Sequence, residues 1–92
     1  MTTSESPQEL IEFPCHFEFK AFGPGGDDSR FCDQVQAAVS TVVQVSRQAM
    51  RVRPSSGGKY QCVSVLATLQ NRTQLEAAYA ALREIDDLKY LL

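Results

Sequence analysis

Hydrophobic and polar residues alternate along three stretches of the chain, and this period of two is typical of β-strands with one buried face. The alternating stretches are 16–22, 47–53 and 60–69. The first of them places Phe17, Phe19 and Ala21 on one face. The third places four apolar residues on one face: Val63, Val65, Ala67 and Leu69. We expect these two faces to line a core.

In two other segments the apolar residues recur three or four positions apart, which is the period of an amphipathic helix. One segment is 30–45, and because it is rich in valine, packing rather than intrinsic propensity must stabilise it. The other begins at the capping-box sequence Thr73-Gln74-Leu75-Glu76 and continues to Ile85. Residues 88–92 can then form a last short strand.

Two glycine-rich stretches predict the remaining connections. Residues 23–28 contain three glycines and a proline, so we expect a loop without regular pairing. Pro54 has no amide hydrogen to donate and ends the second strand. Residues 55–58 then form the turn into the third strand, with a glycine available wherever a positive φ is required.

The order of these elements predicts an α+β domain on the ferredoxin-like βαββαβ plan. This plan has a four-stranded antiparallel sheet in the order 4-1-3-2, with both helices on one face. Residues 47–53 then form an edge strand, and the other sheet face carries no helix. Since 92 residues have room for one core, we expect a single domain over 9–92 and a disordered polar tail at 1–8.

Charge is segregated along the chain, although the net charge is only -2. Residues 1–33 carry seven acids and two bases, a sum of -5. Residues 34–75 carry five bases and no acid, a sum of +5, and the last seventeen residues return to -2. The middle of the chain is therefore the part that would attract an acidic partner or a phosphate.

Composition and cysteine content indicate a cytoplasmic protein. No apolar run is long enough to cross a bilayer, and the polar, acidic first residues lack the features of a secretory signal. The three cysteines, Cys15, Cys32 and Cys62, lack Cys-x-x-Cys spacing. We therefore expect reduced thiols rather than disulfides or a zinc site, and no membrane contact.

Three motifs and the second predicted helix are similar to those of a known family. The motifs are Leu10-Ile11-Glu12-Phe13-Pro14 before the first strand, Pro54-Ser55-Ser56 with Gly58 and Tyr60 at the second turn, and Val63-Ser64-Val65. In these motifs, and through the second helix to Ile85-Asp86, the chain resembles the YbeD-like family of small bacterial proteins. The resemblance implies a ferredoxin-like domain similar to the ACT regulatory domains, here over 9–92, and it implies little about activity.

The basic segment 47–60 contains the candidate ligand or partner site. We expect Arg47 to share a face with the two other arginines of the edge strand. The site itself consists of those two arginines and the residues of the turn: Arg51, Arg53, Ser55, Ser56, Lys59 and Tyr60. Hydroxyls, backbone amides and cations at a turn can bind an anion. Two simpler explanations stay open, because turns require such residues and charged edge strands prevent aggregation of sheets.

The sheet face without helices is the candidate interface. We expect it to carry the apolar residues Phe22, Leu66 and Leu91, with Tyr60 beside them. Sizeable apolar groups on an open face suggest that a second copy or another protein covers it. Scattered exposed apolar residues are also normal on monomers, so this explanation stays open as well.

The sequence offers no catalytic, cofactor-binding or metal site. His16 is the only histidine, and on an extended strand its neighbour Cys15 points the opposite way, so the two cannot form a nucleophile–base pair. The stretch from Gly58 to Val63 resembles the third-strand signature of RNA-recognition domains. Cys62, however, stands where the second stacking ring would be, so base stacking is poorly supported.

These observations favour a non-catalytic regulatory or protein-interaction module without a cofactor. We expect a homodimer, or a protein partner on the open sheet face, and a small-molecule effector is compatible with both. The alternative is a weak nucleic-acid or phosphate-ligand binder that uses 47–60. Salt separates the two functions, because apolar burial survives high salt whereas binding through arginines weakens steeply.

Overall fold

The computed structural model describes residues 12–26 and 29–92, so the tail expected at 1–8 lies outside the described residues. The elements are β1 (Cys15–Pro24), α1 (Arg30–Ser40), the 3₁₀ helix η2 (Arg47–Ala49), β2 (Met50–Pro54), β3 (Tyr60–Leu69), α2 (Arg72–Arg83) and β4 (Tyr90–Leu91). Within the described ranges, no helix has the length and apolar character needed to span a bilayer.

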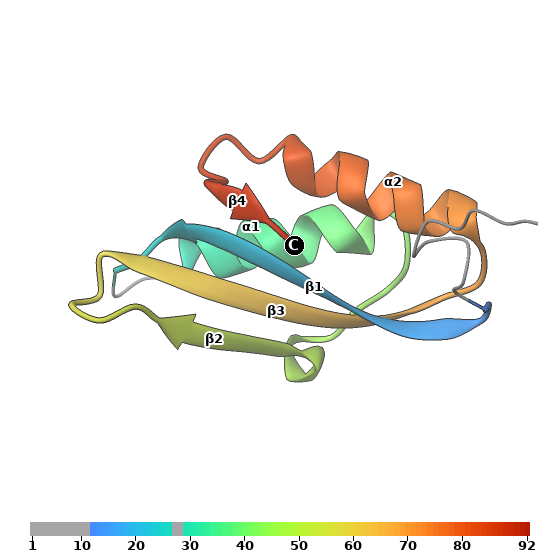
Figure 1. Ribbon diagram of the computed structural model, residues 1–92, viewed down its shortest axis with the longest axis horizontal. Coiled ribbons are helices and arrows are strands. Elements are labelled where there is room, and N and C mark those ends of the chain that lie inside the picture. Colours follow the sequence, from blue (N-terminus) through green and yellow to red (C-terminus); the bar gives the residue numbers. More distant parts are fainter. Residues whose placement is uncertain (1–11, 27–28) are drawn as a thin grey trace, which may run out of the picture.

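The strands form one antiparallel sheet in the order β2-β3-β1-β4, which is the predicted order read from the other side. β1 and β3 are its long central pair, and their ladder runs from Cys15 opposite Leu69 to Pro24 opposite Tyr60. Both helices lie on the same side of the sheet (Figure 1). The predicted α+β ferredoxin-like fold is therefore confirmed.

The core fills the space between the sheet and the two helices. Every second side chain of a strand points to the same face, and the predicted core faces of β1 and β3 are the ones buried there. The strands contribute Phe19, Ala21, Val63, Val65, Ala67 and Leu69, and the helices contribute Phe31, Val35, Val39, Leu75, Ala78 and Leu82. None of the described helices covers the opposite face of the sheet (Figure 1).

β1 continues through Gly23 and Pro24, so the prediction of an unpaired loop from residue 23 was wrong. Gly23 pairs with Gln61, and Pro24 pairs with Tyr60, in the ladder with β3. The Gln61 side-chain amide also donates a hydrogen bond of 2.7 Å to the Pro24 carbonyl. Glycine is needed at this place because a Cβ on Gly23 would lie 2.4 Å from the Phe31 ring. The end of β1 and the start of α1 are thus packed directly together.

α1 ends at Ser40, five residues before the end that the apolar periodicity predicted. Thr41 and two valines follow directly, and their branched side chains have low helix propensity. The Thr41 hydroxyl donates a hydrogen bond of 2.7 Å to the Ala38 carbonyl, which satisfies one of the last carbonyls of the helix. Val45 is nevertheless buried as part of the hydrophobic core, although it lies beyond the helix.

The second strand is shorter than predicted because residues 47–49 form η2 and β2 begins only at Met50. Arg47 turns toward α1, where its guanidinium pairs with the Asp33 carboxylate and lies 2.8 Å from the Cys32 sulfur. The prediction that Arg47 shares a face with the two other arginines of the segment was therefore wrong. Of the three arginines, only Arg51 and Arg53 on β2 therefore share the sheet face that points away from the helices.

α2 begins at Arg72, because Asn71 rather than Thr73 caps it. The Asn71 side-chain oxygen accepts a hydrogen bond of 2.9 Å from the Gln74 amide, and the Gln74 side chain accepts one of 2.7 Å from the Gln70 amide. The predicted helix start was misplaced by two residues, since asparagine is a better N-cap than threonine. The Gln74 side chain reaches back to the amide of the residue before the cap rather than to the amide of Asn71 itself.

Candidate binding surface on the open sheet face

The open sheet face consists of the strand side chains that point away from the helices. The strand register arranges them in rows across the sheet. The rows are Arg51, Ser64 and Lys20; Arg53, Cys62, Phe22 and Tyr90; Leu66 and Glu18; and Thr68 and His16. Leu92 extends the first row, because its backbone exchanges hydrogen bonds of 2.8 and 3.1 Å with Lys20.

Three cations lie in two adjacent rows of this face. Arg51 and Arg53 come from β2 and Lys20 comes from β1, and all three are exposed. Within the described part of the chain, none of them forms an ion pair. Glu18, in the row beyond Lys20, is the one acid that the described strand residues place on the face. A surplus of positive charge attracts acidic groups and repels other surfaces of the same sign.

Large apolar side chains surround the cations. The Phe22 and Tyr90 rings pack at a tilt with their centroids 5.9 Å apart. Tyr60, Leu66, Tyr90 and Leu92 are 44%, 51%, 60% and 52% exposed. Burying apolar surface contributes about 25 cal/mol per Å². These side chains lie on the face that the described helices do not cover, so their burial by a bound molecule would contribute to its binding free energy.

Leu91 is on the opposite side of the sheet from the one predicted. It pairs with Ala21, whose side chain faces the core, and accordingly Leu91 packs against the core. Tyr90, which pairs with Phe22, takes its place on the open sheet face. The sequence could not fix this orientation, because β4 has only two residues and so short a strand shows no alternation.

Two hollows of the open sheet face meet at Arg51. The larger measures 450 Å³ and lies between the β2 arginines and the centre of the face, where Lys20 and Phe22 line it. The second measures 320 Å³ and extends from Arg51 to Leu66. Both hollows are also lined by Glu18. Charged and apolar side chains line both hollows together.

The turn residues of the predicted site are largely occupied by the hairpin itself. The Ser55 amide donates to the Tyr60 carbonyl over 2.8 Å, and the Ser55 hydroxyl accepts from the Tyr60 amide over 3.1 Å. The Gly58 amide donates to the Ser55 carbonyl over 2.8 Å, and both glycines of the turn have positive φ, as expected. Ser56 is exposed, and the Lys59 ammonium lies 5.6 Å from the Tyr60 ring centroid. The turn therefore has fewer free groups for an anion than its composition suggests.

Arg47 acts on α1 rather than on the open sheet face. Its hydrogen bond to Asp33 holds the pKa of that carboxyl below its usual range, and the Ser29 hydroxyl donates a second hydrogen bond of 3.1 Å to the same carboxylate. The Asp33 partner in turn raises the pKa of Arg47. This charge pair fastens η2, and with it the start of β2, to the first turn of α1.

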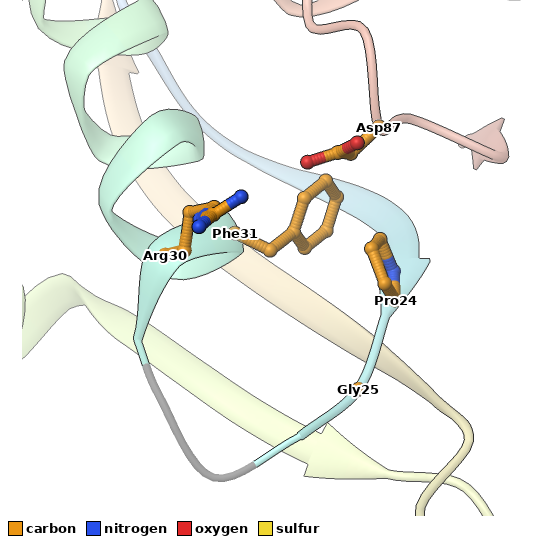
Figure 2. Close-up of a pocket in the computed structure, with 5 residues that line it drawn as sticks. All are labelled: Pro24, Gly25, Arg30, Phe31 and Asp87. Carbon is orange, nitrogen blue, oxygen red and sulfur yellow. The ribbon is translucent and has the colours of Figure 1, made fainter.

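A third hollow lies where β1 ends and α1 begins (Figure 2). It measures 310 Å³ and is lined by Pro24, Gly25, Arg30, Phe31 and Asp87. Arg30 and Asp87 both border the Phe31 ring in this view. Because one cation and one anion, Arg30 and Asp87, line the hollow, its lining carries no surplus of either charge.

The residues considered for catalysis are separated by the sheet. His16 is exposed on the open sheet face, where its Nδ1 lies 3.0 Å from the Thr68 hydroxyl. Cys15 faces the other way and packs against the core, and all three cysteines are free thiols. Among residues 12–26 and 29–92, no three His, Cys, Asp or Glu side chains come close enough together to hold a metal ion.

Comparison with known proteins identifies the family. Residues 8–92 match the DUF493 family, a protein family of unknown function. A UPF0250 protein of Idiomarina loihiensis is 34% identical over 84 residues, which cover 91% of this chain and 92% of the relative. A UPF0250 protein of Ralstonia nicotianae is 34% identical over 100 residues, covering 99% of this chain and 94% of the relative. One from Yersinia pestis is 33% identical over 84 residues, covering 91% and 93%.

Among solved structures, the solution structure of protein HP0495 from H. pylori is similar in fold. Its TM-score is 0.70, and the match covers 100% of this chain and 96% of that one. At 16% sequence identity, this likeness supports the fold alone. The family match and the relatives lead to the identification that the motifs suggested: the chain belongs to the DUF493 family, the YbeD-like UPF0250 proteins of bacteria.

Proposed function

We propose that the protein is a non-catalytic, regulatory or protein-interaction module of the ACT-like kind, whose open sheet face binds another protein. The partner is acidic where it meets Arg51, Arg53 and Lys20, and it has apolar groups that cover Leu66 and the Phe22–Tyr90 pair. The observation that carries the proposal is that three exposed cations, which form no ion pair with any described residue, lie among half-exposed apolar side chains on one sheet face.

Such a surface has the mixed character of a protein interface. The apolar groups supply burial energy, and the cations supply orientation and selectivity. A second copy is a less suitable occupant than an acidic protein, because two faces of this kind would bring like charges together. The free thiols fit a reducing compartment, and we therefore place the module in the cytoplasm.

The proposal of a non-catalytic module rests on how the reactive side chains are distributed. Nucleophilic catalysis needs a nucleophile and a base within hydrogen-bonding reach. Here His16 bonds to Thr68, Cys15 lies on the other face of β1, and the Cys32 sulfur contacts Arg47. We expect no turnover of a substrate that depends on any of these side chains.

Site-specific cross-linking tests the proposal in the bacterial host. A photoreactive phenylalanine analogue replaces Leu66 on the open sheet face or, as the matched control, Ala80, which is exposed on α2. We expect one discrete adduct with an acidic protein from position 66 and none from position 80. The adduct at 66 should disappear when Arg51→Glu is introduced as well. Adducts of equal yield at both positions, or no adduct at 66, would overturn the proposal.

Light scattering during size exclusion, at low and high salt, tests whether a second copy of the chain covers the open sheet face. If an acidic protein rather than a second copy covers the face, we expect the isolated protein and its Leu66→Glu and Arg51→Glu variants all to be monomers. A salt-resistant dimer that Leu66→Glu dissociates would assign the face to a second copy and overturn the acidic-partner proposal. Binding of RNA or polyphosphate, lost in Arg51→Glu, would instead support the phosphate-binding alternative.

A further inference from the structure

Among the strands that residues 12–26 and 29–92 form, β2 is an edge of the sheet, and part of its backbone is not paired with any of them. The Ser55 amide donates to the Tyr60 carbonyl at the base of the hairpin, and hydrogen-bonded pairs alternate along an antiparallel ladder. The backbone groups of the two β2 arginines therefore face β3, whereas those of Val52 face the free edge. Pro54 also faces this edge, where its lack of an N–H leaves no donor unpaired.

The free edge is short, which limits what backbone pairing alone can contribute. β2 has five residues, Met50–Pro54. The Met50 amide already donates to the Arg47 carbonyl of η2, and the turn begins at Ser55. A strand that pairs here finds its main backbone partner in Val52. Side chains must supply the rest of the affinity and the selectivity.

Side chains of β2 alternate in chemical character across the two faces of the sheet. Arg51 and Arg53 point to the open sheet face, where they lie opposite Ser64 and Cys62 of β3. Val52 lies between them on the helix side of the sheet and is 48% exposed. A neighbouring strand places alternate residues beside the arginines and beside Val52. The complementary strand therefore alternates acidic and apolar residues.

A second copy of β2 does not match this edge. Identical strands that meet about a two-fold axis pair antiparallel. A two-fold axis through Val52 places Arg51 of one copy opposite Arg53 of the other. An axis through either arginine places that arginine opposite the same arginine of the second copy. Like charges directly opposite destabilise a strand pair. The arginines thus oppose self-pairing and favour a different strand that carries acids.

A nucleic acid or free phosphate matches the edge less well than a peptide does. Phosphates could meet the two arginines, but they would leave Val52 and the free backbone groups uncovered. The Ser55 hydroxyl and the Gly58 amide, which could have extended an anion site into the turn, are bonded within the hairpin. Only a peptide strand satisfies the backbone, the arginines and Val52 together.

Building on the proposed function, we propose that β2 receives an extended acidic segment of the partner protein as a fifth, antiparallel strand. Two acids of that segment, two residues apart, face Arg51 and Arg53 on the open sheet face. The residue between them is apolar and packs beside Val52, and its backbone pairs with the Val52 amide and carbonyl. The segment adds to the sheet at the end of the strand order that β2 occupies.

The test is an NMR titration of the ¹⁵N-labelled full chain with a capped peptide, Thr-Glu-Val-Glu-Val-Thr. We expect the largest shift changes on β2, with slowed hydrogen exchange of the Val52 amide. Arg51→Gln and Arg53→Gln should each weaken binding by about 1.4- to fivefold, the range of one cross-strand charge pair. Lys89→Gln is the matched control, since Lys89 is exposed beside β4 at the other sheet edge, and affinity should stay unchanged.

Two control peptides separate strand pairing from charge attraction. One has the same composition with adjacent glutamates, and the other is N-methylated at the valine between the glutamates, which removes a donor for the Val52 carbonyl. Both peptides should bind more weakly than the parent peptide. For the N-methylated peptide, the lost hydrogen bond should reduce the affinity by about two- to tenfold. Equal binding of the N-methylated peptide, or shift changes centred on Phe22 and Leu66 rather than on β2, would overturn the inference.

The outcomes also separate this inference from the proposed function. If the peptide does not bind but position 66 still cross-links an acidic protein, strand addition fails and the interaction surface stands. If neither occurs, and the Arg51→Gln/Arg53→Gln double variant self-associates, the arginines serve only to keep sheet edges apart, and both proposals fail.

Discussion

Replacing Gly23 with alanine tests how closely the end of β1 packs on α1. An added Cβ would lie 2.4, 2.5 and 2.7 Å from three atoms of the Phe31 ring, and the ring is only 2% exposed, so it cannot move into solvent without leaving the core. Overpacking a core costs about 1–3 kcal/mol, and Gly→Ala recovers about 0.4–1 kcal/mol through the unfolded chain. We expect a net loss of about 1–2 kcal/mol in the free energy of unfolding.

Urea unfolding at neutral pH measures this loss, and thermal unfolding should show a midpoint lower by about 4–16 °C, given 4–8 °C per kcal/mol for a domain of this size. The matched control combines Gly23→Ala with Phe31→Leu, whose shorter side chain leaves room for the new methyl group. The double variant should lose less stability than the sum of the two single losses. Wild-type stability of Gly23→Ala, or losses that simply add, would refute the direct contact between Gly23 and the ring.

Three further predictions concern the cap, the core and the surface charge pair. Asn71→Ala should lower the free energy of unfolding by about 1 kcal/mol, the usual value of an N-cap, and Asn71→Ser should restore most of it in the same urea assay. Leu82→Ala, in the core at 0% exposure, should cost about 2–5 kcal/mol, whereas Leu66→Ala should change stability by less than about 0.5 kcal/mol; equal losses would contradict the burial described. Because Arg47 lowers the pKa of folded Asp33, the contribution of Asp33 is fully present above the ordinary aspartate pKa and is lost as pH falls through the lowered one. The thermal midpoints of wild type and Asp33→Asn should therefore converge in acid, and a gap that stays constant from neutral to acidic pH would contradict the pair.

The long central strands could be predicted from the sequence because their chemistry is periodic over enough residues. In β3 four apolar residues, Val63, Val65, Ala67 and Leu69, recur at every second position, and all four are buried as expected. α1 was predicted too long because its apolar stripe continues to Val45, which is buried although it is no longer helical. Periodicity shows that a side chain is buried, and it does not show where the backbone stops being helical.

The candidate surface was harder to predict where the structure depends on few residues or on contacts distant in sequence. Arg51 and Arg53 lie on the open sheet face as expected, since β2 alternates. Arg47 leaves that face for Asp33, fourteen residues earlier in the chain. The two-residue β4 exchanges the expected Leu91 for Tyr90. No local pattern carries either piece of information, because both depend on which segments meet in the folded chain.

The central claim is that the open sheet face binds an acidic partner. Its most direct test is to reverse the charges of the contacting residues, first in this protein and then in the partner as well. The cross-link from position 66 first identifies the partner and its contacting acids. The account predicts that Arg51→Glu with Arg53→Glu abolishes the adduct, and that replacing those acids of the partner with lysine restores it. An adduct that persists through the arginine reversals, or that the lysine substitutions fail to restore while both proteins remain folded, would contradict the account.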